Sequence, residues 1–333
     1  MARFPRMQLV DDNQVSVYHC VNRSLRGAFI AGVDKSTGRS YENRRQWLIR
    51  ALQSQSEQLC VDVLAFSVES QQLQVLVRTR PDIAKSLSTQ EVARRYLTGI
   101  PSKAGFDQPA AIPQPEAIKE LAKDPALVAR ARARLSSLSW FVSQITEPLA
   151  RNANREDEIR GRFWEGRFHC LPILDGPALA AAVAHVELSP IFTGDATTLA
   201  GCKGTSVPVR SAALKSGASS WLSSLNGNGK SRKAAKSAPA PYFGIPISEA
   251  DFFAILEWTS KHVMKSERGR FPEKLADSFA ELSLAPDHWL TLVKDFQKIF
   301  RRAAGTPDSL EQQLKRSGLR QMHGVVLARE LFS

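Results

Sequence analysis

The feature that most constrains the fold is a pair of apolar segments separated by a three-residue turn. Val61–Val68 is almost continuously apolar, which is typical of a buried strand. Glu69–Gln71 supplies the turn. Gln72–Arg80 then alternates Leu, Val and Val on one face with Gln, Gln and Leu on the other. The sequence therefore predicts a β-hairpin at the centre of the domain.

Other predicted strands and helices flank this hairpin. Val15–Asn22 is rich in strand-forming residues, whereas Asn43–Leu59 spaces its apolar residues at helical intervals. Downstream, Leu138–Arg155 and Gly176–Leu188 predict helices, and Phe168–Leu174 predicts a short strand. The order strand, helix, strand, strand, helix, strand is that of the split βαβ arrangement of ferredoxin-like folds. We therefore expect an α+β protein with an antiparallel sheet backed by helices.

The rest of the chain divides by composition. Pro81–Ala133 holds five further prolines and predicts an excursion of short helices outside the core. Ala196–Ser248 contains seven Lys or Arg and no acidic residue, and its Gly-, Asn-, Ser- and Pro-rich stretches predict a flexible linker.

The sequence therefore predicts three parts. Residues 1–195 form the domain with the sheet, residues 196–246 form a basic flexible linker, and residues 247–333 form a helical C-terminal domain. Helical periodicity after the linker occurs in Glu249–Met264, Asp287–Ala304 and Leu310–Phe332.

The charge and the cysteine content limit the kinds of partner and metal site that we expect. The net charge of +12 favours a polyanion, because each neutralised phosphate releases condensed counterions. The four cysteines are far apart and form no CxxC pair, so a zinc ribbon is not predicted. The N-terminus lacks the apolar core of a signal peptide, and no apolar run reaches the ~18 residues of a membrane span. We expect a cytoplasmic protein with no membrane partner.

Five segments resemble, in order, the conserved pieces of one protein family. They are Ala2–Arg6, Tyr18–Arg23, Val63–Arg78, Asn154 with Gly161–Phe168 (Gly-Arg-Phe-Trp-Glu-Gly-Arg-Phe), and Glu187–Pro190. Together they resemble the small single-tyrosine transposases of the HUH type, including the REP-associated tyrosine transposases. The resemblance covers about residues 1–200. It implies DNA transposition and recombination by a mobile-element protein, and members of the family are sometimes dimeric, so a homodimer stays open.

The resemblance also implies a chemistry that this sequence departs from. In the family, a His-hydrophobic-His pair on one strand binds a divalent cation, and a tyrosine on a later helix attacks single-stranded DNA. Here the pair reads Gln72-Leu73-Gln74, and the helix at Leu138–Arg155, where the resemblance puts the nucleophile, has no tyrosine. The catalytic nucleophile is therefore unassigned, and we expect weak or absent nicking.

A vestigial metal site is one hypothesis for these positions. Gln72 and Gln74 keep the spacing and the facing of the pair, and Glu69 could add a carboxylate. Amide oxygen is a poor ligand beside imidazole, although a hard cation such as Mg²⁺ or Mn²⁺ accepts it. The alternative is that both glutamines are solvated or bond to their neighbours. If these residues do bind a metal ion, the protein is expected to be an active metal-dependent DNA strand transferase whose nucleophile lies elsewhere. If they do not, no cofactor is expected.

Two His-Cys pairs offer a weaker metal site. His19-Cys20 and His169-Cys170 lie on predicted strands, where adjacent residues face opposite ways. At most one member of each pair can therefore point to a common site.

Basic and aromatic residues interleave in Arg160–Phe168, which follows the predicted helix Leu138–Arg155. Guanidinium groups bind phosphate and aromatic faces stack on unpaired bases, so this pattern suits single-stranded or hairpin DNA. Equally open is that the aromatics pack in the core while the arginines pair with Glu156, Asp157, Glu158 and Glu165. The predicted DNA contacts are Arg3, Arg6, Arg23, Arg26, Arg162, Trp164 and Arg167, with the basic linker. A domesticated interaction protein without DNA binding is the remaining alternative.

Overall fold

A four-stranded antiparallel sheet forms the centre of the protein. The computed structural model describes residues 9–25, 27–100, 112–226, 243–264 and 272–332. The strands lie in the order β2-β3-β1-β4, with every neighbouring pair antiparallel. This order is the one that a split βαβ arrangement produces, so the predicted α+β fold is confirmed. The strands are β1 (Ser16–Arg23), β2 (Val61–Val68), β3 (Gln72–Thr79) and β4 (His169–Ile173).

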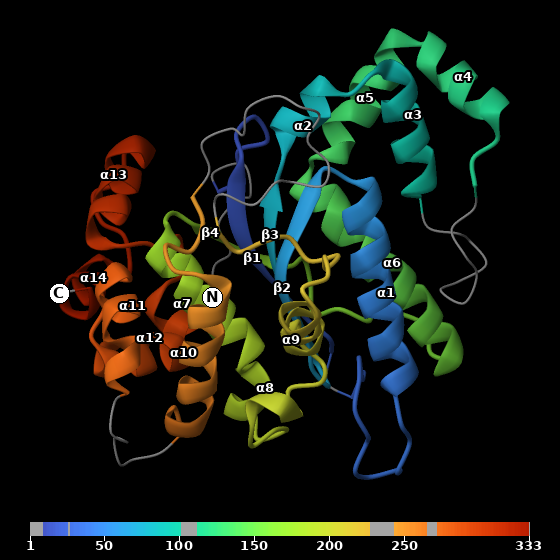
Figure 1. Cartoon of the computed structure of the whole chain (residues 1–333). Coiled ribbons are helices and arrows are strands. Elements are labelled where there is room, and N and C mark those ends of the chain that lie inside the picture. The colour runs from blue at the N-terminus through green and yellow to red at the C-terminus, as the bar shows by residue number, and fades with distance from the viewer. Residues whose placement is uncertain (1–8, 26, 101–111, 227–242, 265–271, 333) are drawn as a thin grey trace.

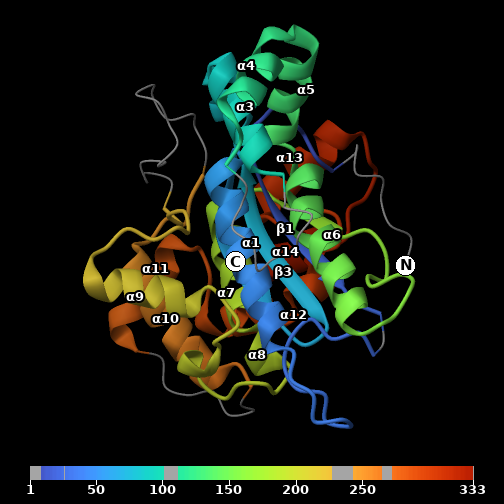
Figure 2. The ribbon, with the colours of Figure 1, turned by 90° about the vertical axis from the view of Figure 1, so that its right-hand side faces the viewer.

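Helices cover both faces of the sheet. On one face α1 (Glu42–Gln58) and α6 (Leu138–Glu156) share a hydrophobic cluster with Tyr18 and Val75. On the other face α7 (Gly176–Glu187) packs in a second cluster. Alternation of side chains along each strand separates the two clusters. Figures 1 and 2 show the sheet between these two layers.

The proline-containing segment after β3 forms a group of short helices that projects from one end of the sheet (Figure 1). Helix starts are set by side-chain caps, because Ser88 accepts from the Glu91 amide and Asp124 accepts from the Ala126 and Leu127 amides. The predicted short helices are confirmed, but their placement outside the core was wrong, because Ile83, Val92 and Val128 belong to the same buried cluster as Tyr18 and Val75. Its helices are α2 (Pro81–Ser86), α3 (Thr89–Thr98), α4 (Pro115–Lys123) and α5 (Pro125–Leu135).

The segment after α7 lies along the outer edge of β2. Thr205 forms a β-bridge with Ser67, and the Val68 amide donates to the Gly204 carbonyl at 2.8 Å. Gly204 is required by this approach, because a Cβ there would lie 2.7 Å from the Val68 carbonyl oxygen. The segment contains α8 (Ser189–Phe192), η2 (Leu199–Gly201) and α9 (Val207–Ser216).

The prediction of a flexible linker over residues 196–246 was therefore wrong for residues 196–226, and also for residues 243–246, where the buried Ile245 donates its amide to the Leu225 carbonyl. Backbone pairing with β2 holds this segment, a long-range interaction that composition does not reveal. Residues 227–242 lie outside the described residues.

The C-terminal helices form a layer on the sheet. Phe252, Trp289 and Leu310 belong to the same hydrophobic cluster as Leu76 of β3 and Leu171 of β4. Ala304 covers the outer edge of β4, where its amide donates to the Pro172 carbonyl and its carbonyl accepts from the Leu174 amide. The predicted helices are present, but they share the core of residues 1–195. They are α10 (Glu249–His262), η3 (Glu273–Leu275), α11 (Ala276–Glu281), α12 (Pro286–Ile299), α13 (Pro307–Ser317) and α14 (Val325–Leu331).

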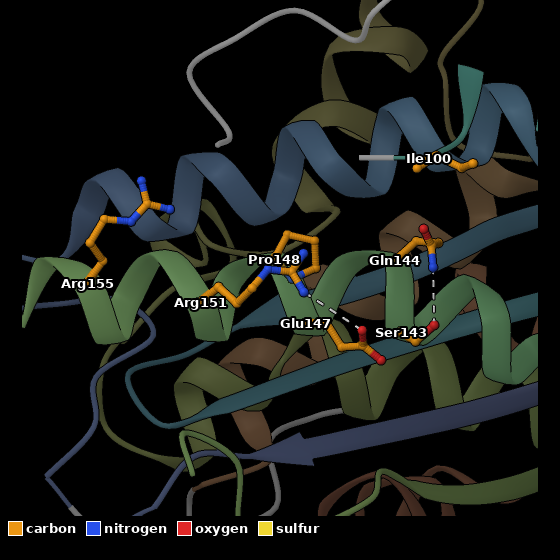
Figure 3. A pocket seen from close by; sticks show the side chains of 7 residues that line it. All are labelled: Ile100, Ser143, Gln144, Glu147, Pro148, Arg151 and Arg155. Atoms are coloured by element: carbon orange, nitrogen blue, oxygen red, sulfur yellow. Dashed lines mark hydrogen bonds and ion pairs between the residues drawn. The ribbon is translucent and has the colours of Figure 1, made fainter. Parts of the chain in front are cut away.

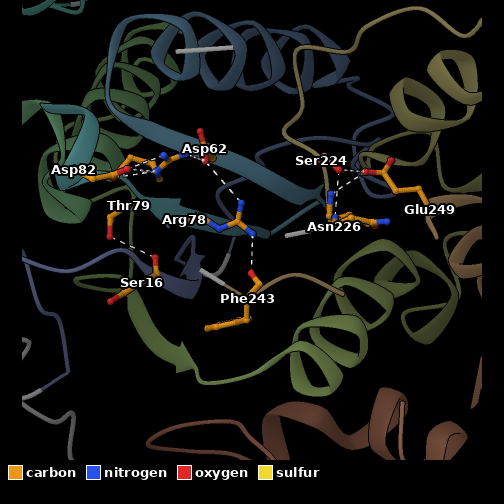
Figure 4. Close-up of polar contacts among 11 residues, drawn as sticks. Ser16, Asp62, Arg78, Thr79, Asp82, Ser224, Asn226, Phe243 and Glu249 are labelled. Carbon is orange, nitrogen blue, oxygen red and sulfur yellow. Dashed lines mark hydrogen bonds and ion pairs between the residues drawn. The ribbon is translucent and has the colours of Figure 1, made fainter. Parts of the chain in front are cut away.

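Two buried arginines, Arg78 in β3 and Arg80 directly after it, form polar contacts at this end of the strand, and Figure 4 shows those of Arg78. Arg80 pairs with Asp82 at 2.7 Å and with Asp62 at 3.3 Å, while Arg78 donates to the Phe243 carbonyl at 3.2 Å. Two guanidiniums and two carboxylates balance each other, which burial of charge requires. Across the described ranges, we find no helix with both the length and the apolar character to span a bilayer.

Candidate functional site

Glu69, Gln72 and Gln74 lie where β2 turns into β3. Gln74 stands beside Ser67 of β2 and Val21 of β1 in the sheet register, on the face that α7 covers. Gln74 is completely buried and Glu69 is buried, whereas Gln72 is half-buried at the strand end. The alternation predicted from the sequence is therefore confirmed, but the two glutamines have different surroundings.

Gln74 is the centre of a buried hydrogen-bond network. Its amide nitrogen donates to Ser189 Oγ at 2.8 Å and to Glu69 Oε1 at 3.2 Å. Its amide oxygen accepts from His19 Nε2 at 2.9 Å and from Gln297 Nε2 at 3.0 Å. A primary amide has two donors and two acceptor lone pairs, so the hydrogen-bonding capacity of Gln74 is fully used.

Glu69 closes one end of the network. Its Oε1 accepts from Ser189 Oγ at 2.5 Å and from Ser67 Oγ at 3.2 Å. Burial raises the pKa of the Glu69 carboxyl, and the hydrogen bonds from Ser189, Gln74 and Ser67 oppose that rise. The carboxyl is thus held by three donors inside the protein.

Two histidines close the other end. Burial lowers the pKa of His19 to about 3 and that of His185 to about 4, so both imidazoles are neutral near pH 7. His185 Nδ1 lies 2.8 Å from the Val293 carbonyl, which makes Nδ1 the protonated nitrogen and leaves Nε2 to accept from Gln297 at 3.1 Å. The ring centroids of His19 and His185 are 6.1 Å apart.

This arrangement bears on the predicted metal ligands. Gln74 already accepts two hydrogen bonds, and Gln72 Oε1 accepts from Arg23 Nε at 2.9 Å. The structure therefore joins Glu69 to Gln74 but turns Gln72 toward Arg23. Within the described ranges, no three His, Cys, Asp or Glu side chains gather as a metal site. Cation binding here stays a prediction.

The helix on which the resemblance places the nucleophile, α6, lies on the opposite face of the sheet from Gln74. Phe141 and Ile145 of α6 pack with Cys20, whereas His19 and Gln74 face α7. The resemblance places a nucleophile on Leu138–Arg155, but the sheet separates this helix, α6, from Gln74. The helix over Gln74 is α7, and its residue at the network is His185.

The described tyrosines also lie away from Gln74. Tyr18 is buried on the α6 face, where burial raises its pKa to about 12. Tyr41 stacks on Phe29, and Tyr96 stacks on Trp140. Tyr242 lies outside the described residues.

The two His-Cys pairs divide between the faces as predicted. Cys20 and Cys170 are direct partners in the β1–β4 register and lie beneath α6. His169 pairs with Val21 and therefore faces the same side as His19.

The segment with Arg162, Trp164 and Arg167 is joined to the end of β1 by backbone hydrogen bonds. Trp164 bridges to Ser24, the Leu25 amide donates to the Phe163 carbonyl, and the Glu165 amide donates to the Arg23 carbonyl. This pairing brings the predicted DNA contacts of two distant segments to one end of the sheet. We call Arg23, Arg162, Trp164 and Arg167 the arginine surface.

The side chains of this segment separate into buried and exposed sets. Phe163 and Phe168 are buried, as the packing alternative predicts. Trp164 is half-buried, and its Nε1 donates to the Thr146 carbonyl at 2.9 Å. The three arginines of the arginine surface are exposed.

Two of the acids that were expected to pair with these arginines are engaged elsewhere. Arg44 holds Glu156 at 2.6 Å and Asp157 at 2.5 Å, and Arg39 approaches Asp157 at 3.2 Å. The predicted contacts Arg3, Arg6 and Arg26 lie outside the described residues.

Comparison with known proteins gives no relative: no family model matches the chain, and neither a curated protein nor a solved structure is significantly similar to it.

Sequence reasoning missed four members of the network, one of which is Ser67 of β2, a donor to Glu69. Ser189 lies in the Glu187–Pro190 segment that the resemblance singled out, so a signal for it existed. His185 and Gln297 carried no local signal, because they reach Gln74 through packing of α7 and α12 on the sheet.

Proposed function

We propose that this protein binds single-stranded or hairpin DNA through the arginine surface, as a transposase-family protein with impaired chemistry. The observation that carries the proposal is the pairing of Trp164 with Ser24, which brings Arg162, Trp164 and Arg167 to the end of β1 beside Arg23. The net charge of +12 supports a polyanionic partner.

The chemistry of the arginine surface suits unpaired nucleic acid. Guanidinium groups contact phosphate through paired N–H donors, and an indole face stacks on a base whatever its identity. Glu156 and Asp157 are held by Arg44, so they do not neutralise the exposed arginines of the segment. Affinity that falls with salt follows from this composition.

Impaired nicking is supported by the network around Gln74. The amide oxygen that would meet a cation accepts hydrogen bonds from His19 and Gln297. The side chain of α7 at this network is an imidazole kept neutral by burial, and it has no hydroxyl to attack a phosphodiester.

The binding test uses fluorescence anisotropy with a labelled DNA hairpin. Arg162→Ala with Arg167→Ala is expected to weaken binding and to make the negative slope of log affinity against log salt less steep by about 1.4, because each lost phosphate contact on single strands removes ~0.7. Arg329→Ala, an exposed arginine on α14, serves as the control and should bind as the unaltered protein does. An unaltered protein with no salt-dependent affinity would instead support an interaction protein that does not bind DNA.

The chemistry test incubates the same hairpin with Mg²⁺ or Mn²⁺ and resolves it on a denaturing gel. We expect an unchanged strand, with binding verified on a parallel native gel. A cut strand or a protein–DNA adduct would contradict impaired nicking and favour the metal-dependent strand transferase. In that case Gln72→Ala should abolish cutting, and the peptide in the adduct would identify the nucleophile.

A further inference from the structure

A groove of about 480 Å³ runs along α6 on the opposite side of the sheet from the Gln74 network. Its size is that of a site for a small ligand or for part of a larger one. Figure 3 shows the side chains that line it along α6, with Ile100 of the α3 end at one extremity. The lining residues are Ile100, Ser143, Gln144, Glu147, Pro148, Arg151 and Arg155.

One helical stripe supplies most of the groove. Gln144, Pro148, Arg151 and Arg155 are spaced i, i+4, i+7 and i+11, so they lie on one side of α6. The two arginines are one turn apart, about 6 Å between their Cβ atoms. The stripe therefore presents two guanidiniums in a row beside an apolar ring and an amide.

The arginines are available to a ligand. Arg151 approaches Glu147 only at 3.9 Å, and these side chains are 63% and 66% exposed, so the pair is weak. Arg155 donates to Asn152 Oδ1 at 2.7 Å, a neutral partner that leaves its charge in place. One carboxylate against two guanidiniums leaves the groove positive.

The proline inside α6 adds an acceptor. Pro148 has no backbone N–H, so the Gln144 carbonyl lacks the donor that a continuous helix would supply. Gln144 and Pro148 both line the groove, so a side-chain amide and an apolar ring lie together at its wall. A ligand with both an anion and an N–H donor would satisfy the two kinds of group together.

We infer that this groove holds a few unpaired nucleotides of the DNA, with phosphates on Arg151 and Arg155 and a base against Ile100, Pro148 and the side-chain amide of Gln144. The inference rests on the proposed DNA binding and extends it to a second surface. Unpaired bases carry N–H donors and a flat apolar face, and their phosphates repeat along the strand. One ligand can therefore bind the arginines, the apolar residues and the acceptor of the groove together.

The groove is continuous in the chain with the arginine surface. Arg155 lies in the last turn of α6, and Asn154 Nδ2 donates to the Gly161 carbonyl at 2.9 Å, which ties that turn to the following segment. The stripe from Gln144 to Arg155 extends about 16 Å along the helix. Arg155 is therefore the groove residue that lies nearest in sequence to the arginine surface.

The test compares two labelled hairpins by anisotropy, one blunt and one with a short single-stranded tail. For the unaltered protein the tail should raise affinity about tenfold, because stacking and phosphate contacts add to the stem contacts. Arg151→Ala with Arg155→Ala should lose that gain, and its negative salt slope for the tailed DNA should be less steep by about 1.4, while binding to the blunt hairpin is retained.

A charge-matched control removes two cations from the other layer. Lys261→Ala with Lys298→Ala likewise removes two positive charges from helices, and each lysine pairs with a carboxylate. The exposed fraction of Lys261 is 62%, similar to that of Arg151. This control should keep the gain from the tail. If the arginine variant keeps it too, or if the tail adds nothing to the unaltered protein, the groove proposal fails while DNA binding stands. If the unaltered protein binds neither hairpin, the proposed function itself fails, and the groove proposal with it.

A tail of abasic residues separates base contacts from phosphate contacts. It keeps the phosphates and removes the bases, so most of the tenfold gain should disappear. An abasic tail that binds as tightly as a natural one would overturn the base contact with Gln144.

Discussion

His19 Nε2 on β1 lies 2.9 Å from Gln74 Oε1 on β3, and both side chains are buried. The imidazoles near this position therefore come from β1 and α7, whereas β3 supplies amides. Gln74 thus bonds His19 directly and is linked to His185 through Gln297. Gln74 is fully bonded within the protein, whereas His19 Nδ1 is buried without a hydrogen-bond partner in the described part of the chain. The members of the network can be tested separately.

Gln74→Ala should destabilise the protein by about 2–4 kcal/mol. The change leaves buried partners such as Ser189, His19 and Gln297 without one of their hydrogen bonds, and unpaired buried polar groups are costly. Urea denaturation followed by circular dichroism measures the loss. Gln72→Ala, on the same strand and face but half-buried, should cost less than ~1 kcal/mol. Equal losses for the two variants would argue against a buried network centred on Gln74.

Glu187 should make stability fall as pH rises from about 4.5 to 7. Burial raises the pKa of the Glu187 carboxyl from 4.5 to about 7, although Arg210 and Ser206 oppose the rise. Because the folded state binds the proton more tightly than the unfolded state, the stabilisation is full below 4.5 and is lost as pH rises through 7. The total change is about 3 kcal/mol, from ~1.4 kcal/mol for each unit of pKa.

The measurement for Glu187 is the difference in unfolding free energy between the unaltered protein and Glu187→Gln at several pH values. Glu187→Gln should be the more stable of the two at pH 8, and its advantage should shrink toward pH 5. Subtracting the two curves cancels the contributions of the other titrating groups. A difference that does not change between pH 5 and 8 would refute a raised pKa for Glu187.

His19 and His185 should remain neutral at least down to pH 5. Burial lowers the pKa of His19 to about 3 and that of His185 to about 4, below the usual 6.5. Their contribution to stability is therefore present above 6.5 and is lost as pH falls through 4 and then 3. Long-range ¹H–¹⁵N spectra should show the proton of His185 on Nδ1, facing the Val293 carbonyl, and that of His19 on Nε2, facing Gln74. A ring that titrates near 6.5 would contradict the burial.

Arg44→Ala should destabilise the protein by about 3–5 kcal/mol. The Arg44 side chain is completely buried, bonds Glu156 and Asp157, and donates to the Phe29 carbonyl, so its loss leaves two carboxylates without their main partner. The next residue provides the control, because Arg45 is 23% exposed and pairs with Glu42 within one helical turn. Arg45→Ala should cost less than ~1 kcal/mol. Thermal unfolding of both variants would reveal similar losses if Arg44 had no such role.

The sequence was sufficient for the sheet and for the facing of the glutamines. Alternation in Gln72–Arg80 and the apolar run of Val61–Val68 are local patterns, and the hairpin follows from them. The position of α6 was not accessible in this way. Its apolar stripe would fit either face of a sheet, and only packing decides that it covers Cys20 while α7 covers Gln74.

The network and the linker were mispredicted for the same physical reason. Gln297 bonds Gln74 although the two residues are 223 positions apart in the sequence. Thr205 pairs with Ser67 through backbone groups, which does not require particular side chains. Basic residues and glycines in residues 196–226 therefore suggested a spacer where the chain has α9 and a bridge to β2. Local patterns carry no record of such contacts.

The two outer strands of the sheet are each sealed by chain that follows residue 195. Thr205 covers β2, and Ala304 covers β4. An unsealed strand presents a row of free amide and carbonyl groups, a template on which copies of a chain associate. A truncated protein ending at residue 195 would have both rims open, and we expect it to collect in inclusion bodies while the full chain stays monodisperse.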